Sequence, residues 1–365
     1  MKTFFLQTTL LLLLLLSAPG VSAQKDMKAR SWKSIAHGKP GPWYGSAEAL
    51  QLADTLIRYQ TAVGGWPKNI KWNREIPHDE MRQIALTGIG ATIDNGATTG
   101  EMRYLAKVYA QTHEPRVAES FVRALGYLLD AQYDNGGWPQ FYPIRSPRSY
   151  SKCITYNDDA MLNVLVLLRD VRDGKGETAA IPLADSLRVR AGEAFDRGID
   201  CIVKTQIRVD GEPTVWCAQH DENTLLPAKA RAYELPSFSG AESAGLTLLL
   251  MELPDPSAEV IAAVKGARKW YDEHKIEGMK FVRERDAEGK AQAKLVPSEG
   301  DVIWARFYDL DTAEPFFCDR DGIKRKSIDE LGHERRNGYG WYTTAPMKVL
   351  NEYEKWLERI GRNTK

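Results

Sequence analysis

The fold is decided by a stretch that occurs twice, first as Gln60-Thr61-Ala62-Val63-Gly64-Gly65-Trp66-Pro67-Lys68-Asn69 and again as Gln132-Tyr133-Asp134-Asn135-Gly136-Gly137-Trp138-Pro139-Gln140. In both copies the tryptophan follows the glutamine by six residues. A weaker third copy contains Gln206, Gly211 and Trp216. The tryptophans lie 72 and 78 residues apart, a period that suits a pair of helices joined by a long loop. We therefore expect about three helix pairs.

The apolar residues between these copies follow the helical period. Residues 115–132 and 257–274 carry apolar side chains on one face, as outer amphipathic helices do. Residues 160–168 and 244–251 are apolar nearly all round, which is typical of buried helices. An inner ring of helices wrapped by an outer ring makes the expected fold class all-α, an α/α toroid with long loops. Residues 279–318, which contain several pairs of apolar or aromatic residues, predict a small β excursion.

Length and charge narrow the class of protein. The chain has 365 residues with 49 basic and 49 acidic side chains, so it lacks the positive excess that binds nucleic acid or membrane surfaces. Residues 1–23 combine a charged start, an apolar run and a small-residue end, the pattern of a secretory signal. We expect cleavage after Ala23, a mobile basic N-terminal extension over 24–39 and a single catalytic domain over 40–361. We expect the exported protein to be a monomer that is either secreted or periplasmic.

Cysteine and histidine form no metal-binding motif. Cys153, Cys201, Cys217 and Cys318 are far apart, and the six histidines form no HxxxH or Cys/His cluster. The pattern leaves open whether one cysteine pair is bridged in an oxidising compartment. A transition-metal site is therefore not expected.

A polar cluster precedes each expected helix pair, at residues 92–99, 154–160 and 231–237. Taken singly, Asp94 or Asp158 is best explained as a helix N-cap. Recurrence at the same end of several helix pairs suggests instead that the clusters meet at one opening. The hard oxygen ligands that Ca²⁺ prefers would come from Asp94, Asn95, Asp158 and Asp159.

The arginines and the tryptophans each admit two interpretations. Arg231, Arg320 and Arg335 lie in expected loops, where they either pair with neighbouring acids in solvent or meet an anionic ligand. The Trp-Pro loops either pack helix pairs together or expose ring faces on which sugars stack. Residue pattern alone leaves both questions open.

Seven motifs in a fixed order carry a family resemblance. They are residues 64–69, 92–98, 135–140, 156–160, 230–236, 304–308 and 335–342. Together they resemble the family ten polysaccharide lyases, which are pectate lyases, over about residues 60–345. The resemblance implies an (α/α)₃ toroid, an incomplete α/α barrel. It also implies cleavage of de-esterified polygalacturonate by Ca²⁺-assisted β-elimination.

The resemblance also implies roles for individual residues. The aspartates of the first two polar clusters, Asp94 and Asp158, match the Ca²⁺ ligands, and Arg231 matches the arginine that is regarded as the base. The residues that match or are expected to form the substrate site are Lys68, Asn95, Arg320, Arg335 and Tyr339.

These residue types suit the chemistry of β-elimination. The reaction removes the proton at C5, next to the uronate carboxylate, and expels O4, so cations are needed where negative charge develops. Arginine is an unusual base, because a guanidinium with a pKa of ~12.5 or higher is normally charged. Nearby Ca²⁺ disfavours the charged form, so we expect the activity to be highest at alkaline pH.

Three other functions are compatible with parts of the pattern. A glycoside hydrolase on the same toroid, acting on an acidic plant polysaccharide, would use Asp94 and Asp158 as acid and base. The Gln-to-Gly-Gly-Trp spacing is similar to the structural repeat of terpene cyclases. A non-catalytic pectin-binding protein is the remaining alternative.

Overall fold

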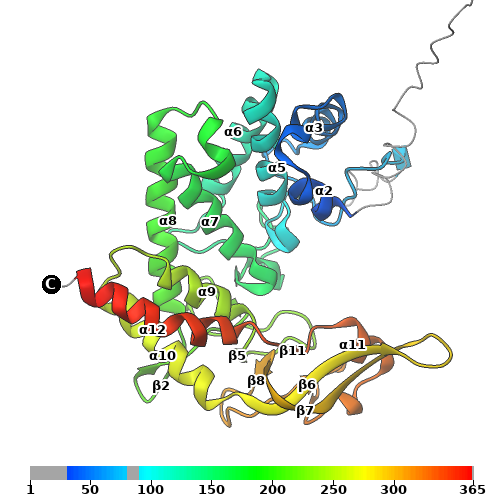
Figure 1. Ribbon diagram of the computed structural model, residues 1–365, viewed down its shortest axis with the longest axis vertical. Helices are drawn as coiled ribbons and strands as arrows, with labels where there is room; N and C mark the ends of the chain where they lie inside the picture. The colour runs from blue at the N-terminus through cyan, green and yellow to red at the C-terminus, as the bar shows by residue number, and fades with distance from the viewer. Residues whose placement is uncertain (1–30, 80–89, 364–365) are drawn as a thin grey trace, which may run out of the picture.

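Three pairs of helices form the centre of the structure, a computed structural model that describes residues 31–79 and 90–363 (Figure 1). The pairs are α5 (Thr99–Thr112) with α6 (Pro115–Asp130), α7 (Ala160–Asp173) with α8 (Asp185–Thr205), and α9 (Glu242–Met251) with α10 (Ala258–Glu273). The structure also contains α2 (Trp32–Gly38), α3 (Ala47–Tyr59), α11 (His333–Gly338) and α12 (Pro346–Asn363). The prediction of a mostly helical fold is confirmed. The predicted signal peptide, residues 1–23, lies outside the described residues.

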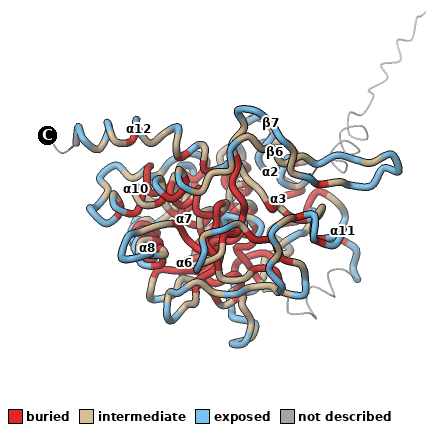
Figure 2. The backbone as a smooth tube through the Cα atoms, turned by 90° about the horizontal axis from the view of Figure 1, so that it is seen from below, coloured by how far each residue is buried: buried red, intermediate tan, exposed pale blue. Residues whose placement is uncertain are grey.

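The paired helices lie in two layers. Helix α7 contacts both α5 and α9, while α8 contacts both α6 and α10. Most residues of α9 are buried, whereas α6 and α10 bury one face, as their sequence patterns predict. Figure 2 shows the buried residues concentrated between the helices. The layers therefore share one hydrophobic core, which extends from Ile35 near the start of the described chain to Trp356 in α12.

Each repeated tryptophan is fully buried and is fixed by the helix that precedes it. Trp66, Trp138 and Trp216 have no exposed surface. Their indole N–H groups donate to carbonyl oxygens near the ends of α3, α6 and α8, at Leu56 (2.8 Å), Leu128 (2.7 Å) and Ile202 (2.7 Å). A buried indole N–H needs such a partner. These tryptophans pack the helix pairs together, and the alternative that their faces bind sugars is wrong.

The repeated glutamines join each outer helix to the next one. Their side-chain amides donate across to α6, α8 and α10, from Gln60 to the Ser120 carbonyl (2.9 Å), from Gln132 to Ala194 (2.8 Å) and from Gln206 to Ala263 (2.9 Å). The glycine pair permits this close approach. Gly64 has a φ of +103°, and a Cβ there would lie 2.4 Å from the Arg123 carbonyl oxygen. The repeat is therefore a structural joint between helix pairs.

A long β-hairpin extends from the helical body, which confirms the small β excursion predicted over 279–318. Strands β6 (Ile276–Arg285) and β7 (Ala291–Ala305) are antiparallel, and β11 (Tyr342–Thr343) pairs with the base of β7. The hairpin lies at the lower right in Figure 1, and its tip is exposed in Figure 2. Helix α11 lies against β7, where Asn337 Oδ1 accepts from the Ala293 N–H at 2.6 Å. The hairpin thus supports the segment that carries Arg335 and Tyr339.

The remaining strands are two residues long and form small ladders between loops. They pair as β1 (Ile154–Thr155) with β4 (Gln219–His220), β2 (Arg208–Val209) with β3 (Glu212–Pro213), β5 (Phe238–Ser239) with β8 (Phe307–Tyr308), and β9 (Phe317–Cys318) with β10 (Lys324–Arg325). Two of these ladders connect the loops in front of α7 and α9 to later parts of the chain. They help to hold the long loops in place at one end of the helix pairs.

The structure describes residues 31–39 of the predicted mobile extension over 24–39, and most of them form a helix; residues 24–30 lie outside the described residues. Residues 32–38 form α2, which buries Ile35 and Ala36 and packs against α5. Lys107 Nζ donates to the Ala36 carbonyl at 3.2 Å and so joins the two helices. The burial of Ile35 and Ala36, an apolar pair within a basic stretch, anchors this segment to the helical body.

Two further expectations concern cysteines and membranes. Cys153, Cys201, Cys217 and Cys318 are all buried and unpaired in the structure. Within residues 31–79 and 90–363, no helix has the length and apolar character needed to cross a bilayer.

Candidate functional site

Two equivalent turns introduce the inner helices α5 and α7. They are the short 3₁₀ turns η2 (Asp94–Gly96) and η4 (Asn157–Asp159), which contact each other. Asn95 and Asp158 occupy matching left-handed positions with φ of 55° and 52°, which Asn and Asp tolerate better than most residues. Neither Asp94 nor Asp158 caps a helix, so the N-cap interpretation is wrong. Recurrence brings the first two polar clusters together, as predicted.

Backbone hydrogen bonds identify the segment of the third helix pair that is equivalent to η2 and η4. The N–H groups of Thr92, Thr155 and Ser239 each donate to the carbonyl of the repeated tryptophan before them, at 3.1, 3.1 and 2.7 Å. The third equivalent of the two turns is therefore the segment at Ser239, which runs into Glu242 at the start of α9. The predicted cluster at 231–237 is a separate loop ahead of it.

Asp94 is almost fully buried beneath the first turn. Its Oδ2 accepts from Gln140 Nε2 at 2.8 Å and forms an ion pair with Lys68. Its Oδ1 is buried and has no hydrogen-bond partner in the part of the chain that the structure describes. Asn95, next in sequence, is exposed and donates to Asn69 Oδ1 at 3.2 Å. Lys68 and Asn95, both predicted in the substrate site, thus flank Asp94.

Arg306 connects the second turn with the start of α9. Its Nη2 lies 3.0 Å from Asn157 Oδ1 and 3.2 Å from Asp158 Oδ1, and it also pairs with Glu242. Burial alone would lower the pKa of Arg306, but Glu242 and Asp158 raise it above its ordinary value. Arg306 is therefore a permanent buried cation that neutralises part of the carboxylate cluster. The charged form of Asp159, by contrast, is disfavoured, because burial and the neighbouring carboxylates of Glu242 and Asp158 raise its pKa.

Arg231 lies in a turn of its own and is held by Glu234. Its Nε donates to Glu234 Oε2 at 2.6 Å, and its Nη2 pairs with the other carboxylate oxygen. Burial by itself would lower the pKa of Arg231, but the pair with Glu234 outweighs it and raises the pKa above its ordinary value. The Arg231 side chain is 41% exposed, whereas that of Glu234 is only 2% exposed. Arg231 is thus a charged group with access to the solvent side.

Aromatic rings hold three arginines in one group. Arg231 and Arg335 both lie over the rings of Tyr233 and Tyr339, at 4.4 to 5.9 Å from the ring centroids. Arg320 lies 5.8 Å over Tyr233 and shares Glu334 with Arg335. These residues come from the 231 loop, the loop after β9 and the α11 segment. The aromatic rings and the shared carboxylate of Glu334 offset the repulsion between the three positive charges.

The residues of this group that are predicted to bind the substrate differ in their exposure to solvent. Arg320 is well exposed, whereas Arg335 is almost fully buried. Tyr339 is also buried, and its hydroxyl donates to Glu234 Oε1 at 2.8 Å. Tyr339 therefore supports Glu234 and the arginines, and Arg320 is the member most open to a ligand.

Tyr150 and Tyr339 connect these parts into one site. Burial raises the pKa of Tyr150, Arg231 lowers it, and Glu234 and Asp94 raise it, so Tyr150 is within electrostatic range of both the arginine loop and the first turn. Tyr339 connects the other side, since its ring lies 4.7 Å from the Arg306 guanidinium. Every predicted site residue therefore belongs to one continuous polar region.

Two hollows open along this region and meet at Asp158 and Asp159. One, of about 680 Å³, reaches from these residues past Asn95 to α2. The other, of about 550 Å³, runs from them past Glu242 and Arg306. Together they make a groove that crosses the start of α7. Its lining combines charged side chains with apolar ones such as Leu162 and Leu248.

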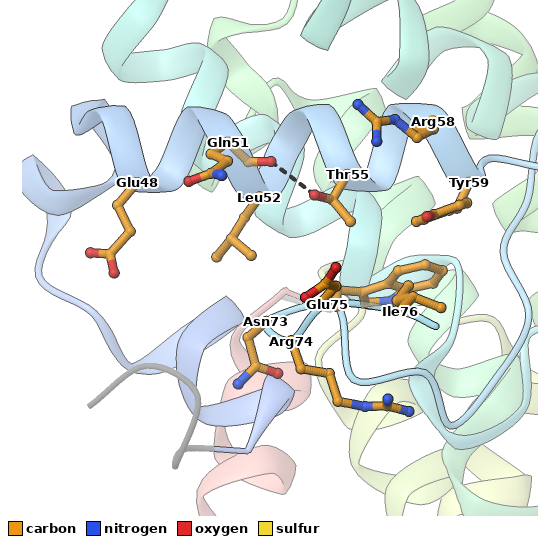
Figure 3. A pocket seen from close by; sticks show the side chains of 11 residues that line it. Glu48, Gln51, Leu52, Thr55, Arg58, Tyr59, Asn73, Arg74, Glu75 and Ile76 are labelled. Atoms are coloured by element: carbon orange, nitrogen blue, oxygen red, sulfur yellow. Dashed lines mark hydrogen bonds between the residues drawn. The ribbon is translucent and has the colours of Figure 1, made fainter. Parts of the chain in front are cut away.

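A separate hollow of about 400 Å³ lies between α3 and the loop over residues 72–76. Figure 3 shows side chains from α3, among them Glu48 and Thr55, facing Asn73 and Glu75 across it. Charges of both signs line it, and it contains none of the predicted site residues. It is therefore a poorer match to an acidic ligand than the groove at Asp158.

The two turns offer oxygen donors of the kind that Ca²⁺ prefers. The unpartnered Oδ1 of Asp94 and the oxygens of Asn95 and Asp158 are hard ligands of the kind this ion prefers. Lys68 pairs with the other oxygen of Asp94, and both oxygens of Asp158 have partners, Arg306 at Oδ1 and the Asn157 amide at Oδ2. No group of three or more His, Cys, Asp or Glu side chains able to hold a metal occurs among the residues described. The side chains thus offer a partial shell, which an acidic ligand would complete.

The helical fold brings the carboxylates of two turns and a group of arginines into one polar region, which suits an acidic ligand. Comparison with known families makes this specific, because the model of the pectic acid lyase family matches residues 60–350. The chain belongs to this family, and it is a pectate lyase.

Solved structures agree with this assignment. A family 10 polysaccharide lyase from Cellvibrio cellulosa is 35% identical, with a TM-score of 0.73 over 87% of this chain and 96% of that one. An aspartate-to-alanine mutant of a lyase from the same organism, in complex with trigalacturonic acid, is also 35% identical, with a TM-score of 0.75 over 89% of this chain and 95% of that one. A search of curated proteins finds no match.

Sequence reasoning assigned no role to four polar residues of the site. Glu234 and Arg306 lie inside the motifs that carry the resemblance, but the sequence did not show which residues they contact. Tyr150 and Glu242 lie outside every motif. Only the packing of loops that are distant in sequence brings them to the groove.

Proposed function

We propose that this pectate lyase cleaves de-esterified polygalacturonate by Ca²⁺-assisted β-elimination, with Arg231 as the base. The observation that carries the proposal is that two opposite kinds of group belong to one polar region, in which Arg306 contacts both Asp158 and the ring of Tyr339. Oxygen ligands come from η2 and η4, and arginines come from the 231 loop and the α11 segment. The trigalacturonic acid bound by the similar lyase supports the choice of substrate. We further propose that the three helix pairs correspond to the incomplete (α/α)₃ toroid of the family.

Asp94, Asn95 and Asp158 would hold the Ca²⁺ ion together with a substrate carboxylate. When bound, the ion supplies positive charge at the carboxylate next to C5 and makes the C5 proton more acidic. Asp94 is kept in place by Gln140 and Lys68, so its free oxygen has a defined direction. Arg306 keeps the carboxylate of Asp158 at the groove surface.

The chemical step is then assigned to Arg231. A deprotonated guanidine takes the C5 proton, the C5–H electron pair forms the C4–C5 double bond, and the C4–O4 bond breaks with its electrons on O4. The departing O4 is protonated by solvent. Because Glu234 keeps Arg231 charged at neutral pH, only the small deprotonated fraction can react, and activity should rise with alkaline pH.

The remaining arginines and Lys68 would bind the other acidic groups of the polymer. Arg320 is exposed and its planar guanidinium matches a carboxylate. Arg335 and Tyr339 are buried, so their contribution is to fix the positions of Arg231 and Arg320. Lys68 sits between Asp94 and the ring of Phe141, where it can meet a substrate carboxylate once the metal occupies Asp94.

The signal sequence supports an exported enzyme. Residues 1–23 have the pattern of a signal peptide, which directs a protein to export. We propose that the mature protein starts at Gln24, is secreted or periplasmic, and acts as a monomer.

The test is to incubate the mature protein with polygalacturonate, with Ca²⁺ and with excess chelator, and to identify the product ends. We expect unsaturated ends with Ca²⁺ and very few with chelator. Asp158→Ala should behave like chelation, whereas Asp196→Ala, on the exposed face of α8, serves as the matched control. Saturated reducing ends would indicate hydrolysis, and full activity in chelator would refute the metal role.

A further inference from the structure

The end of the groove beyond Asn95 is walled by α2 and has no part in the chemistry described above. Trp32, Lys33 and His37 of α2 line the hollow of about 680 Å³ together with the segment 67–71 and the first turns of α5. The family match starts at residue 60, so α2 precedes it. This end of the groove is thus formed partly by a segment that the family match does not include.

Helix α2 is a firm wall. Ile35 and Ala36 are fully buried, and the Ala36 carbonyl accepts from both Lys107 Nζ and the Tyr44 hydroxyl, at 3.2 and 3.0 Å. The Trp32 ring packs against the Tyr104 ring at 5.1 Å between centroids. These contacts fix the opposite face of α2 and leave Lys33 directed to the solvent side.

The charges at this end are available to an anion. Lys33 and Lys71 both line the hollow, and neither has an ion-pair partner among the residues that the structure describes. Lys33 interacts electrostatically with the carboxylate of Asp159 at the other end of the same hollow. The third basic residue, Arg103, is already engaged by Asp170 and Glu177. Lys33 and Lys71 are therefore the cations that a bound carboxylate would meet.

A buried acid on the lining of the hollow lacks part of its hydrogen bonding. Glu101 is only 3% exposed, and its Oε1 accepts from the indoles of Trp72 and Trp32 at 2.8 and 3.1 Å. Its Oε2 is buried and has no hydrogen-bond partner among the described residues. A buried oxygen without a partner is unfavourable, so a hydroxyl donor from a ligand would be stabilising there.

We propose that this α2-walled end of the groove is a subsite for one further galacturonate unit of the polymer, away from the cleaved bond. Lys33 and Lys71 would bind its carboxylate, Glu101 would accept from a ring hydroxyl, and the partly exposed Trp32 would lie against the sugar. Cation, acceptor and aromatic ring together match the groups that a uronic acid presents. The inference rests on the proposed function for its choice of sugar.

The test compares how tightly hexagalacturonate and trigalacturonate bind, measured by titration calorimetry. All proteins carry Arg231→Ala so that the oligomers stay intact. Lys33→Ala should reduce the ratio of hexamer to trimer affinity about fivefold, the size expected for one partly exposed charge pair. Lys39→Ala is the matched control, because Lys39 lies over the Trp43 ring and does not line the hollow. Thermal unfolding checks that each variant is folded.

A hexamer-to-trimer ratio that is unchanged in Lys33→Ala, or reduced equally in Lys39→Ala, would overturn the subsite. A further reduction in the Lys33→Ala/Lys71→Ala double variant would support it. Failure of the proposed function has a different signature, which is wild-type protein that binds the hexamer but releases no unsaturated ends. Since binding is measured without turnover, the subsite is tested in either case.

Discussion

Replacing Glu234 by Gln removes one charge next to Arg231 and leaves the shape of the side chain. The carboxylate accepts from Arg231 Nε at 2.6 Å and from the Tyr339 hydroxyl at 2.8 Å, and it is the group that raises the pKa of Arg231. If Arg231 is the base, Glu234→Gln should enlarge its deprotonated fraction at a given pH. The alkaline rise in rate should therefore begin at lower pH.

The size of this effect follows from the geometry of the pair. Two unit charges about 3 Å apart interact with about 5.5 kcal/mol at an effective dielectric constant of about 20 and with about 1.4 kcal/mol in water. The Arg231 side chain is 41% exposed, so solvent screening moves the value toward the lower limit. We take about 2 kcal/mol, which equals a displacement of the pH–rate profile by about 1.5 pH units.

The assay is kcat against pH on saturating polygalacturonate, with release of unsaturated ends as the signal. A merely structural role of Glu234 would lower the rate at every pH by the same factor and leave the profile in place. The reasoning is refuted if the Glu234→Gln profile keeps its position within about 0.3 pH units while the protein remains folded, a change of only about 0.4 kcal/mol. Arg231 would then act as a fixed cation, and the base would have to be sought elsewhere.

Four further predictions concern other parts of the chain. Arg231→Ala and Arg231→Lys should both lower kcat by far more than tenfold at saturating substrate. The lysine variant should fail as well because an ammonium on a flexible stem does not replace a fixed guanidinium. A decrease in kcat of no more than about tenfold (~1.4 kcal/mol) would exclude Arg231 as the base. Asp158→Ala should remove the stimulation by Ca²⁺, and a normal Ca²⁺ titration of activity would contradict its role as ligand. His220 is buried and its pKa is lowered to about 4 by that burial, so the unfolded chain binds a proton that the folded one excludes. The free energy of unfolding, measured with denaturant, should therefore fall by about 2 kcal/mol from pH 7 to pH 5, and His220→Asn should lose this part of the pH dependence. Mass spectrometry of the exported protein should find Gln24 as its first residue, and a peptide that contains Met1 would contradict processing after Ala23.

The helical architecture could be predicted because its signals are local or periodic. The apolar faces predicted α6 and α10, and the all-round apolar runs predicted α7 and α9. Repetition of the Gln and Gly-Gly-Trp pattern predicted that the pairs share one joint. What the pattern left open was the direction of the tryptophans, since an aromatic ring looks the same in sequence whether it faces the core or a sugar. The hydrogen bonds from Trp66 and Trp138 to the preceding helices settle it in favour of the core.

The candidate site was predictable in part. The two aspartate clusters were recognised because they recur, and recurrence at one end of a repeated unit implies proximity in space. Their third counterpart, at Glu242, was missed because its loop has a different length and residue content. The same limit applies to α2, since no motif shows that a short basic segment buries Ile35 and Ala36 against α5.

Sequence by itself determined the helix pairs, the joint that repeats between them and the chemical types available at their ends, because these depend on neighbours within a few residues. Tertiary structure alone decided which of those groups meet. The Tyr339 hydroxyl supports Glu234, Arg306 neutralises Asp158 and Glu242, and the β-hairpin supports the segment that carries Tyr339. These contacts join residues that are up to about 150 positions apart. Electrostatic energy depends on distance in space and on burial, which a linear order of residues does not contain.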